Sequence, residues 1–225
     1  GNGCDGATTT VQVGTGNLSN TGTSYPSPYG NHFESVRHQF LYRASDLTAA
    51  GVSPGRITGM GFYILNRIGA YIYYNFTIKV KCTTTTALTQ GVPETGNFTT
   101  VVNPRPVSIP TSGWTNHAFD NHYDWDGTSN LIFEVCFNND TDPNNNTSIT
   151  GNSQVLSTNA GYIASAWYPV DNQDACSGAI GNSSNLGASN NRPNIRLYTC
   201  DAAPPFTVSW SPANTLTSAT SRTPT

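Results

Sequence analysis

Short segments of alternating apolar and polar residues run along most of the chain. In residues 74–82, YNFTIKVKC, one face of the expected strand is apolar, and the other, with Lys79 and Lys81, is expected to face solvent. Residues 130–139, NLIFEVCFNN, are apolar on both faces, which indicates a strand in the middle of a sheet. Residues 57–65 place large apolar side chains on one face and glycines on the other.

The same pattern predicts more strands, and turn residues separate them. Further strands are expected at 8–13, 36–43, 98–102, 115–119, 153–157, 161–167 and 193–199. Segments rich in Gly, Pro, Asn and Asp lie between them, and no long helical pattern alternates with them. The sequence therefore predicts an all-β fold, a jelly-roll-like antiparallel β-sandwich with one short helix near residues 45–50.

The expected helix follows a strand that carries Arg37, His38 and Arg43. Ser45 is expected to cap the start of this helix, and Gly51 to end it in a left-handed conformation. A catalytic histidine needs a nucleophile or a carboxylate partner, and no motif in the sequence supplies one. We therefore expect the two arginines and the histidine to form hydrogen bonds at a sheet face or edge.

The composition narrows the classes of function. Charged residues make up only 10% of the 225 residues, and the formal net charge is −3. This balance leaves no basic surface for nucleic acid and no polybasic patch for a membrane. Aromatic residues make up 11%, so a packed core is expected. No apolar run reaches about 18 residues, so no membrane span is predicted.

The cysteines point to an oxidising compartment. The five cysteines contain no CxxC pair, which argues against a zinc site and a thioredoxin-like redox site. We expect one or two disulfides, with Cys4, Cys200, Cys82 and Cys136 as candidates. Cys4 and Cys200 bracket the expected domain and could join its ends, but the connectivity stays open because spacing alone does not fix it.

Two units are expected along the chain. Residues 1–202 form the β-sandwich, and residues 203–225 are a linker followed by the first strand of another β module. The chain opens GNGCDGATTT, without a signal peptide, and this opening is typical of the interior of a longer precursor.

Four segments in this order resemble a known family: YPSPYGNHFESVRHQFLYRASDLTAAGVSPGRITGMGFYI, NFTIKVKCT, GWTNHAFDNHYDWDGTSNLIFEVCFNN and NRPNIRLYTC. They are similar to a β-sandwich module of very large secreted Bacteroidota proteins, which are often exported by the type IX secretion system. The tail VSWSPANTL resembles the start of an immunoglobulin-like or PKD-like repeat. The resemblance implies export and an adhesive or scaffold role, and it brings no catalytic residues.

One polar loop is a candidate calcium site. Asp140, Asp142 and Asn144 stand at alternate positions of DTDPNNN, a spacing at which oxygen ligands can wrap a calcium ion. The loop lacks the glycine and the bidentate glutamate of an EF-hand, so a plain Asn/Asp loop is the simpler interpretation.

A second polar segment, DNHYDWDG, gathers Asp120, Asp124 and Asp126 with His122. Paired carboxylates can serve in acid–base catalysis or bind a metal. In the family that the chain resembles, this segment is a turn into a central strand, which is the reading we favour.

Trp114, Trp125 and Trp167 are candidates for a ligand-binding surface, because aromatic faces suit the C–H faces of sugars. Such residues more often belong to the core or rim of a sandwich.

Together these features predict a non-catalytic structural or adhesive module of a large secreted bacterial surface protein or extracellular appendage. Its partners would be neighbouring modules, further copies in a homo-oligomer or filament, or a glycan or protein on a cell surface. No cofactor is expected apart from the calcium considered above. The alternative is a carbohydrate-binding module attached to a secreted hydrolase.

Overall fold

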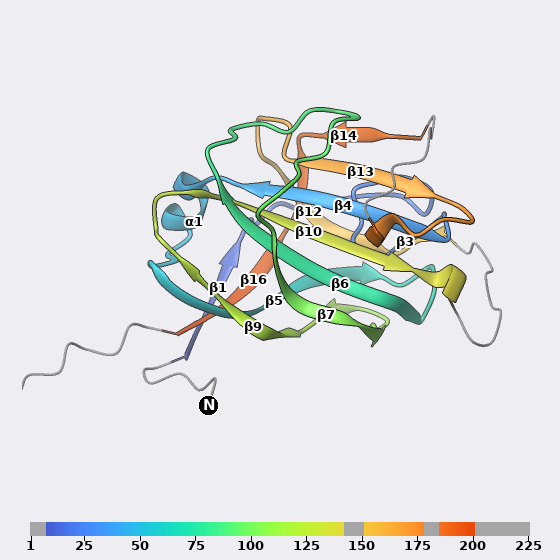
Figure 1. Ribbon diagram of the computed structural model, residues 1–225, viewed down its shortest axis with the longest axis horizontal. Helices are drawn as coiled ribbons and strands as arrows, with labels where there is room; N and C mark the ends of the chain where they lie inside the picture. The colour runs from blue at the N-terminus through green and yellow to red at the C-terminus, as the bar shows by residue number, and fades with distance from the viewer. Residues whose placement is uncertain (1–7, 142–150, 178–184, 201–225) are drawn as a thin grey trace, which may run out of the picture.

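The computed structural model describes residues 8–141, 151–177 and 185–200, which fold into a sandwich of two antiparallel sheets (Figure 1). The predicted all-β sandwich with one short helix is confirmed. Residues 203–225, expected to begin another module, lie outside the described residues, so this division of the chain stays a prediction. Among the described residues, no helix is long and apolar enough to cross a membrane.

The first sheet is built around the long strand β5 (Gly55–Asn66), and we call it the β5 sheet. Strands β16 (Ile195–Cys200), β12 (Gln154–Asn159), β8 (Gly113–Trp114) and β9 (His117–Trp125) pair with β5. Strand β1 (Thr8–Val13) pairs with β16, and β2 (Leu18–Ser19) and β15 (Asn191–Pro193) pair with β12.

The second sheet, the β4 sheet, has the order β14 (Gly187–Ser189), β13 (Ser165–Val170), β4 (Ser35–Tyr42), β10 (Asn130–Asn138), β6 (Ile72–Thr83) and β7 (Thr99–Ser108). A small separate pair joins β3 (Gly30–Asn31) to β11 (Gly151–Asn152). Two short 3-10 helices, η1 (Asn139–Thr141) and η2 (Ala175–Ser177), follow strands of the β4 sheet.

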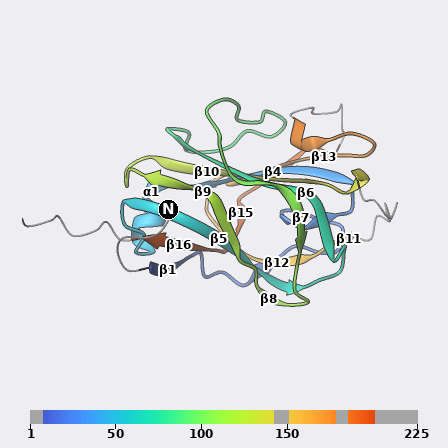
Figure 2. The same ribbon diagram turned by 60° about the horizontal axis from the view of Figure 1, so that its bottom comes forward.

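Aromatic side chains fill the space between the two sheets, which form two layers in Figure 2. Phe40 of β4 and Phe62 of β5 meet across the sandwich, with ring centroids 6.0 Å apart. Tyr29, from the loop before β3, is fully buried and stacks on Phe76 of β6 at 5.9 Å. Burying such large side chains supplies most of the driving force for a fold with so few ion pairs.

The outer face of the β4 sheet is also covered, and here the sequence prediction was wrong. Lys81 was expected on a solvated face, but it is only 7% exposed. The long segment 84–98 folds back over this face, and its Leu88 packs with Leu41 and Ile132 in a second, smaller core. This cover explains why β4 is buried on both faces.

The short helix α1 (Ala44–Ala49) begins one residue earlier than expected. Ser45 lies inside the helix, and Arg43 is the N-cap residue, so the predicted cap was wrong. The Asp46 carboxylate accepts a hydrogen bond from the Arg43 backbone N–H at 3.4 Å. The predicted end is confirmed: Gly51 has a φ of +95° and donates its N–H to the Thr48 carbonyl.

Strand β6 contains an irregularity that shifts its inward face. Asn75 has a φ of +53°, and the pairing register with β7 changes on either side of Phe76. As a result Tyr73 is fully buried and Tyr74, which the simple alternation had placed inward, is only partly buried.

The first and last strands place two distant parts of the chain side by side. Strand β1 is antiparallel to β16, and Thr8 is the partner of Cys200. The chain therefore enters β1 and leaves β16 at one end of the sandwich, where the two strands are labelled in Figure 1.

Candidate functional site

The structure does not bring the three candidate tryptophans together. On β5, Trp114 pairs with Tyr63 and Trp125 with Gly55, which separates the two tryptophans by about 26 Å at about 3.3 Å per residue. Trp167 belongs to the other sheet and stacks on Tyr25 at 5.6 Å while packing against the core.

Of the three, Trp125 is buried, whereas Trp114 and Trp167 are partly exposed. Trp125 is 2% exposed and donates its indole N–H to the Ser129 carbonyl at 2.8 Å, so its proposed ligand-binding role was wrong. Trp114 is partly exposed, with the edge of its ring against Tyr63 and the Arg196 guanidinium 4.2 Å from the ring centroid. Trp114 remains the aromatic candidate for a sugar.

The carboxylates of 120–127 hold turns and neighbouring strands together. Asp120 accepts a hydrogen bond of 2.7 Å from Arg105, and its pKa is lowered, mainly by the hydrogen bond that it accepts from the Asn103 backbone. Hydrogen bonds from the Ser129 hydroxyl and from the Ser129 and Thr128 backbone N–H groups lower the pKa of Asp126 to about 2, so it stays ionised and orders the turn before β10. Asp124 is exposed.

The geometry of this segment does not form a catalytic pair. His122 lies 3.8 Å from Asp124, which is too long for a hydrogen bond. Asp124 also lies 3.5 Å from Arg56. These contacts favour a structural role for the segment.

The proposed calcium loop is not tested. Asp142 and Asn144 lie outside the described residues, and Asp140 stands at the exposed start of that segment, in η1. Among the described residues, no group of three or more His, Cys, Asp or Glu side chains is placed to hold a metal ion.

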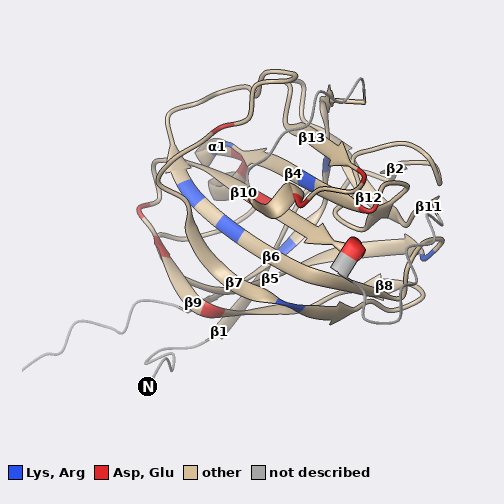
Figure 3. Ribbon diagram, turned by 45° about the vertical axis from the view of Figure 1, so that its right-hand side comes forward, with Lys and Arg blue, Asp and Glu red and all other residues tan. Residues whose placement is uncertain are grey.

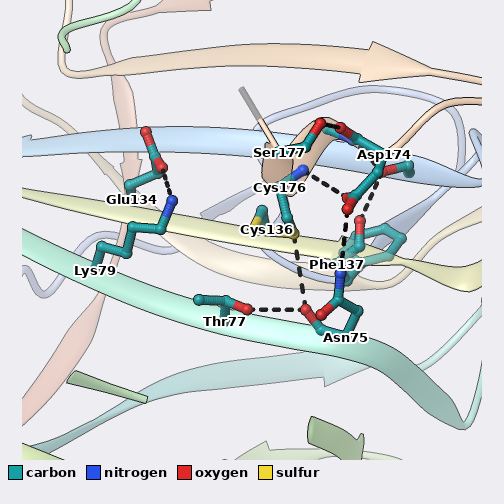
Figure 4. Close-up of a disulfide and its surroundings, with 11 residues drawn as sticks. Asn75, Thr77, Lys79, Glu134, Cys136, Phe137, Asp174, Cys176 and Ser177 are labelled. Carbon is teal, nitrogen blue, oxygen red and sulfur yellow. Dashed lines mark hydrogen bonds and ion pairs between the residues drawn. A yellow bond between two sulfur atoms is a disulfide. The ribbon is translucent and has the colours of Figure 1, made fainter. Parts of the chain in front are cut away.

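The cysteines differ from the prediction in one pairing. Cys136 of β10 is bonded to Cys176 of η2 (Figure 4), whereas the candidate Cys82 is a free thiol, so its inclusion was wrong. Cys200 is disulfide-bonded. Its predicted partner Cys4 lies outside the described residues, so the pairing of the two stays a prediction.

The three basic residues of 36–43 have separate structural surroundings. His38 is fully buried against Phe40 inside the sandwich. Arg43 lies 3.7 Å above the Tyr162 ring and donates to a carbonyl of the segment 84–98. Arg37 is on the opposite face of β4, the outer face that the segment 84–98 covers. The expectation of structural hydrogen bonds therefore fits Arg43 but not the other two.

The outer face of the β4 sheet carries two adjoining hollows, which we call the outer groove. The first has a volume of about 350 Å³ and is lined by Arg37, Lys79, Asn97 and Glu134 among others. The second, of 280 Å³, shares Lys79 and Thr100 with the first and extends towards Cys176 and η2. The groove thus runs between the segment 84–98 and the disulfide.

Two ion pairs lie at the outer groove, whose lining includes Lys79, Glu94 and Glu134. Lys79 lies 3.1 Å from Glu134, which is buried, and Lys81 lies 2.8 Å from Glu94. The bond from Lys81 is the main reason that the pKa of Glu94 is lowered. In Figure 3 basic positions on β4 and β6 flank the strand β10, which carries an acidic one between them.

A glutamine fixes the segment 84–98 to the sheet. The Gln39 amide donates to the Glu94 carbonyl at 2.7 Å and accepts from the Glu94 backbone N–H at 2.8 Å. The same amide donates to the Glu134 carboxylate at 2.8 Å. The rim of the groove is therefore held in place by buried hydrogen bonds, which favour a defined shape.

Sequence reasoning missed this groove. Gln39, Glu94 and Cys176 stand far apart along the chain, and no motif links them. The available signal was the alternation of 36–43, in which Arg37 and Gln39 share a face with Leu41. A face that mixes apolar and charged residues indicates a covered surface with polar partners.

Comparisons with known proteins assign neither family nor function. No family model and no curated protein matches the chain. A structure of the clostridial cysteine protease Cwp84 after propeptide cleavage matches with a TM-score of 0.40 and 13% identity, covering 87% of this chain and 40% of that one.

A second solved structure is similar to the same degree. It contains the cysteine protease and lectin-like domains of Cwp84, a surface layer associated protein of Clostridium difficile, and matches with a TM-score of 0.39 and 12% identity. It covers 75% of this chain and 32% of that one, so the chain spans less than half the length of either match.

Proposed function

We propose that this protein is a non-catalytic structural and adhesive module of a large secreted bacterial surface protein. The observation that carries the proposal is the position of the two ends of the fold. Thr8 and Cys200 are direct partners on neighbouring strands, and Cys200 is disulfide-bonded at the point where the chain leaves the sandwich.

The closeness of the two ends of the fold suits a module that stands in a chain under tension. If Cys200 is bonded to Cys4, as the sequence predicts, a pull on the two ends acts on the cross-link and the strands of the core carry little of it. In addition, the Cys136–Cys176 bond ties η2 to strand β10 of the β4 sheet. Both cross-links need an oxidising compartment, which supports export and display at the cell surface.

The surface composition supports contacts with neighbours. Strand β1 lies at an edge of the β5 sheet, and its first three residues are exposed threonines. The low share of charged residues, 10%, limits repulsion between copies. Neighbouring modules, other copies of the chain and a cell-surface target are therefore the partners that we propose.

An adhesion assay under flow tests the proposal. Beads that carry the protein pass over a surface coated with the same protein and over an array of neutral and acidic glycans. Retention on at least one surface, with every glycan left intact, is the expected result. Retention on no surface would contradict the adhesive role, and cleavage of an arrayed glycan would contradict the non-catalytic one.

A second candidate function is a carbohydrate-binding module attached to a secreted hydrolase. The partly exposed Trp114 with the neighbouring Tyr63 is the observation that favours it. In that case Trp114→Ala is expected to weaken binding to a neutral glycan by up to about tenfold, because a stacked aromatic contact contributes about 0.5–1.5 kcal/mol.

A substitution on the segment that covers the β4 sheet controls for general surface effects. Val92 is 62% exposed on the segment 84–98, and Val92→Ala should leave glycan binding unchanged. Equal binding by both variants would remove the support for this second function.

A further inference from the structure

Arg37 is a buried cation without a partner. It is 6% exposed, and its guanidinium forms no hydrogen bond or ion pair with any described residue. Its Nε and Nη2 atoms are both buried and unpartnered. The guanidinium lies 5.2 Å from the centroid of the Tyr168 ring, whose hydroxyl group is likewise buried and unpartnered.

Such an arrangement is unfavourable for the unbound protein. Buried charges in folded proteins are normally paired, because the lost hydration is otherwise not replaced. The neighbouring acids do not supply the missing partner, because Glu134 is bonded to Gln39 and Lys79, and Glu94 is bonded to Lys81. Once these pairs are formed, one positive charge remains on the outer groove.

The chemistry of the free atoms selects the class of ligand. Nε and Nη2 form one edge of the planar guanidinium, which matches the two oxygens of a carboxylate. Arg37 lines the first hollow of the outer groove, where Lys79 and Thr100 lie at the junction with the second hollow. Arg37 therefore borders a space that is open to solvent, although its Nε and Nη2 atoms are themselves buried.

We propose that the outer groove binds an acidic saccharide, with Arg37 holding the carboxylate of a hexuronic acid unit. The first hollow, of 350 Å³, has the size of a small-ligand site. Its wall offers both donors and acceptors for sugar hydroxyls, through Lys79, Glu134 and Asn97, and the Phe98 ring lies at its rim. The adjoining hollow gives room for a second unit.

Binding requires a small adjustment of Arg37. Its two free nitrogens are shielded from solvent in the unbound chain, so we expect the side chain to turn towards the hollow that it lines. The inference rests on the proposed adhesive function, because it names the ligand class of that module.

Titration calorimetry with galacturonate, galactose and inorganic sulfate tests the proposal on the whole chain. Galacturonate is expected to bind, galactose at the same concentration to give no signal, and sulfate to bind more weakly than galacturonate. Binding of galactose as tight as that of galacturonate would show that the carboxylate is not recognised. Sulfate binding as tight as galacturonate would reduce the groove to a simple anion site and overturn the saccharide assignment.

Substitutions of Arg37 separate binding from folding. Arg37→Met is expected to weaken galacturonate binding by about 10²-fold and to leave the melting temperature unchanged or higher, because a lone buried charge is removed. Arg56→Met, on the β5 sheet, is the matched control and should bind like the parent protein. Unchanged galacturonate binding in Arg37→Met would overturn the proposal.

A second variant covers the case in which Arg37→Met does not fold. Arg37→Lys keeps the charge but has no planar fork, so at least a tenfold loss of galacturonate affinity is expected. Equal affinity in Arg37→Lys would contradict a bidentate contact. If galacturonate fails to bind while the protein-coated beads still adhere to another surface, only this inference is wrong. If the beads adhere to no surface, the proposed adhesive function is contradicted.

Discussion

Lowering the pH from 7 to 5 is expected to reduce the free energy of unfolding by about 4 kcal/mol. The cause is a pair of histidines in the core. Burial lowers the pKa of His38 to about 3, and burial together with the charge of Arg105 lowers the pKa of His117 to about 3. Both imidazoles are therefore neutral in the folded protein at pH 5.

The sign follows from proton binding in the two states. An unfolded histidine takes up its proton near pH 6.5, whereas the folded protein resists protonation until about pH 3. Between these values the unfolded state binds more protons, so stability is complete above pH 6.5 and is lost as the pH falls. Each histidine contributes about 1.4 kcal/mol for every pH unit below 6.5.

Urea unfolding at several pH values measures this slope. His38 has no hydrogen-bond partner on either ring nitrogen among the described residues, so His38→Phe should keep its stacking on Phe40 and remove about half of the slope. A free energy of unfolding that stays flat from pH 7 to pH 5 would contradict the burial of the two histidines.

Removing the Cys136–Cys176 bond is expected to cost about 4 kcal/mol, the value for a closed loop of roughly this length. The two cysteines are 40 residues apart in sequence, and the bond fixes η2 on the outer face of β10. Cys176 also contacts the Asn75 carbonyl through its sulfur at 3.7 Å, and its N–H donates to Asp174 (Figure 4). In the variant that carries both Cys136→Ala and Cys176→Ala, η2 should no longer be fixed to β10.

Denaturant unfolding of the double variant beside Cys82→Ala gives a matched comparison. Cys82 is a free, partly exposed thiol, so its replacement should change stability by less than about 1 kcal/mol. A double variant as stable as Cys82→Ala would show that the cross-link does not stabilise the fold.

Local alternation in the sequence predicts the strands well. Residues 8–13 form β1 as expected, and the two-sided apolar pattern of 130–139 places β10 inside its sheet. The glycines opposite the core on β5 also have a reason. A side chain at Gly61 would collide with the Thr115 carbonyl, which crosses that face between β8 and β9.

Contacts between distant segments could not be predicted in the same way. The polar face of β6 looks solvated because nothing in its sequence shows that 84–98 folds over it. Trp125 resembles a binding residue until its indole N–H is seen to bond within the turn before β10. Cys176 has no neighbouring strand pattern, and its pairing depends on where η2 packs.

The outer groove arises from the same long-range packing. Arg37 was expected to hydrogen-bond at a sheet face, and alternation correctly put it on the face opposite the core. Whether its guanidinium is paired depends on Glu134 and Glu94, whose partners come from the two strands β4 and β6. A missing partner of this kind becomes visible only in three dimensions.

Stretching single molecules by their two ends tests the central claim most directly. If the cross-link at Cys200 carries the load, the oxidised protein should show no unfolding step from the sandwich. Cys200→Ser should instead release about 50 nm of chain, at about 3.5 Å per residue and with the Cys136–Cys176 loop still closed. An oxidised parent protein that unfolds with the same gain in length as Cys200→Ser would contradict the account.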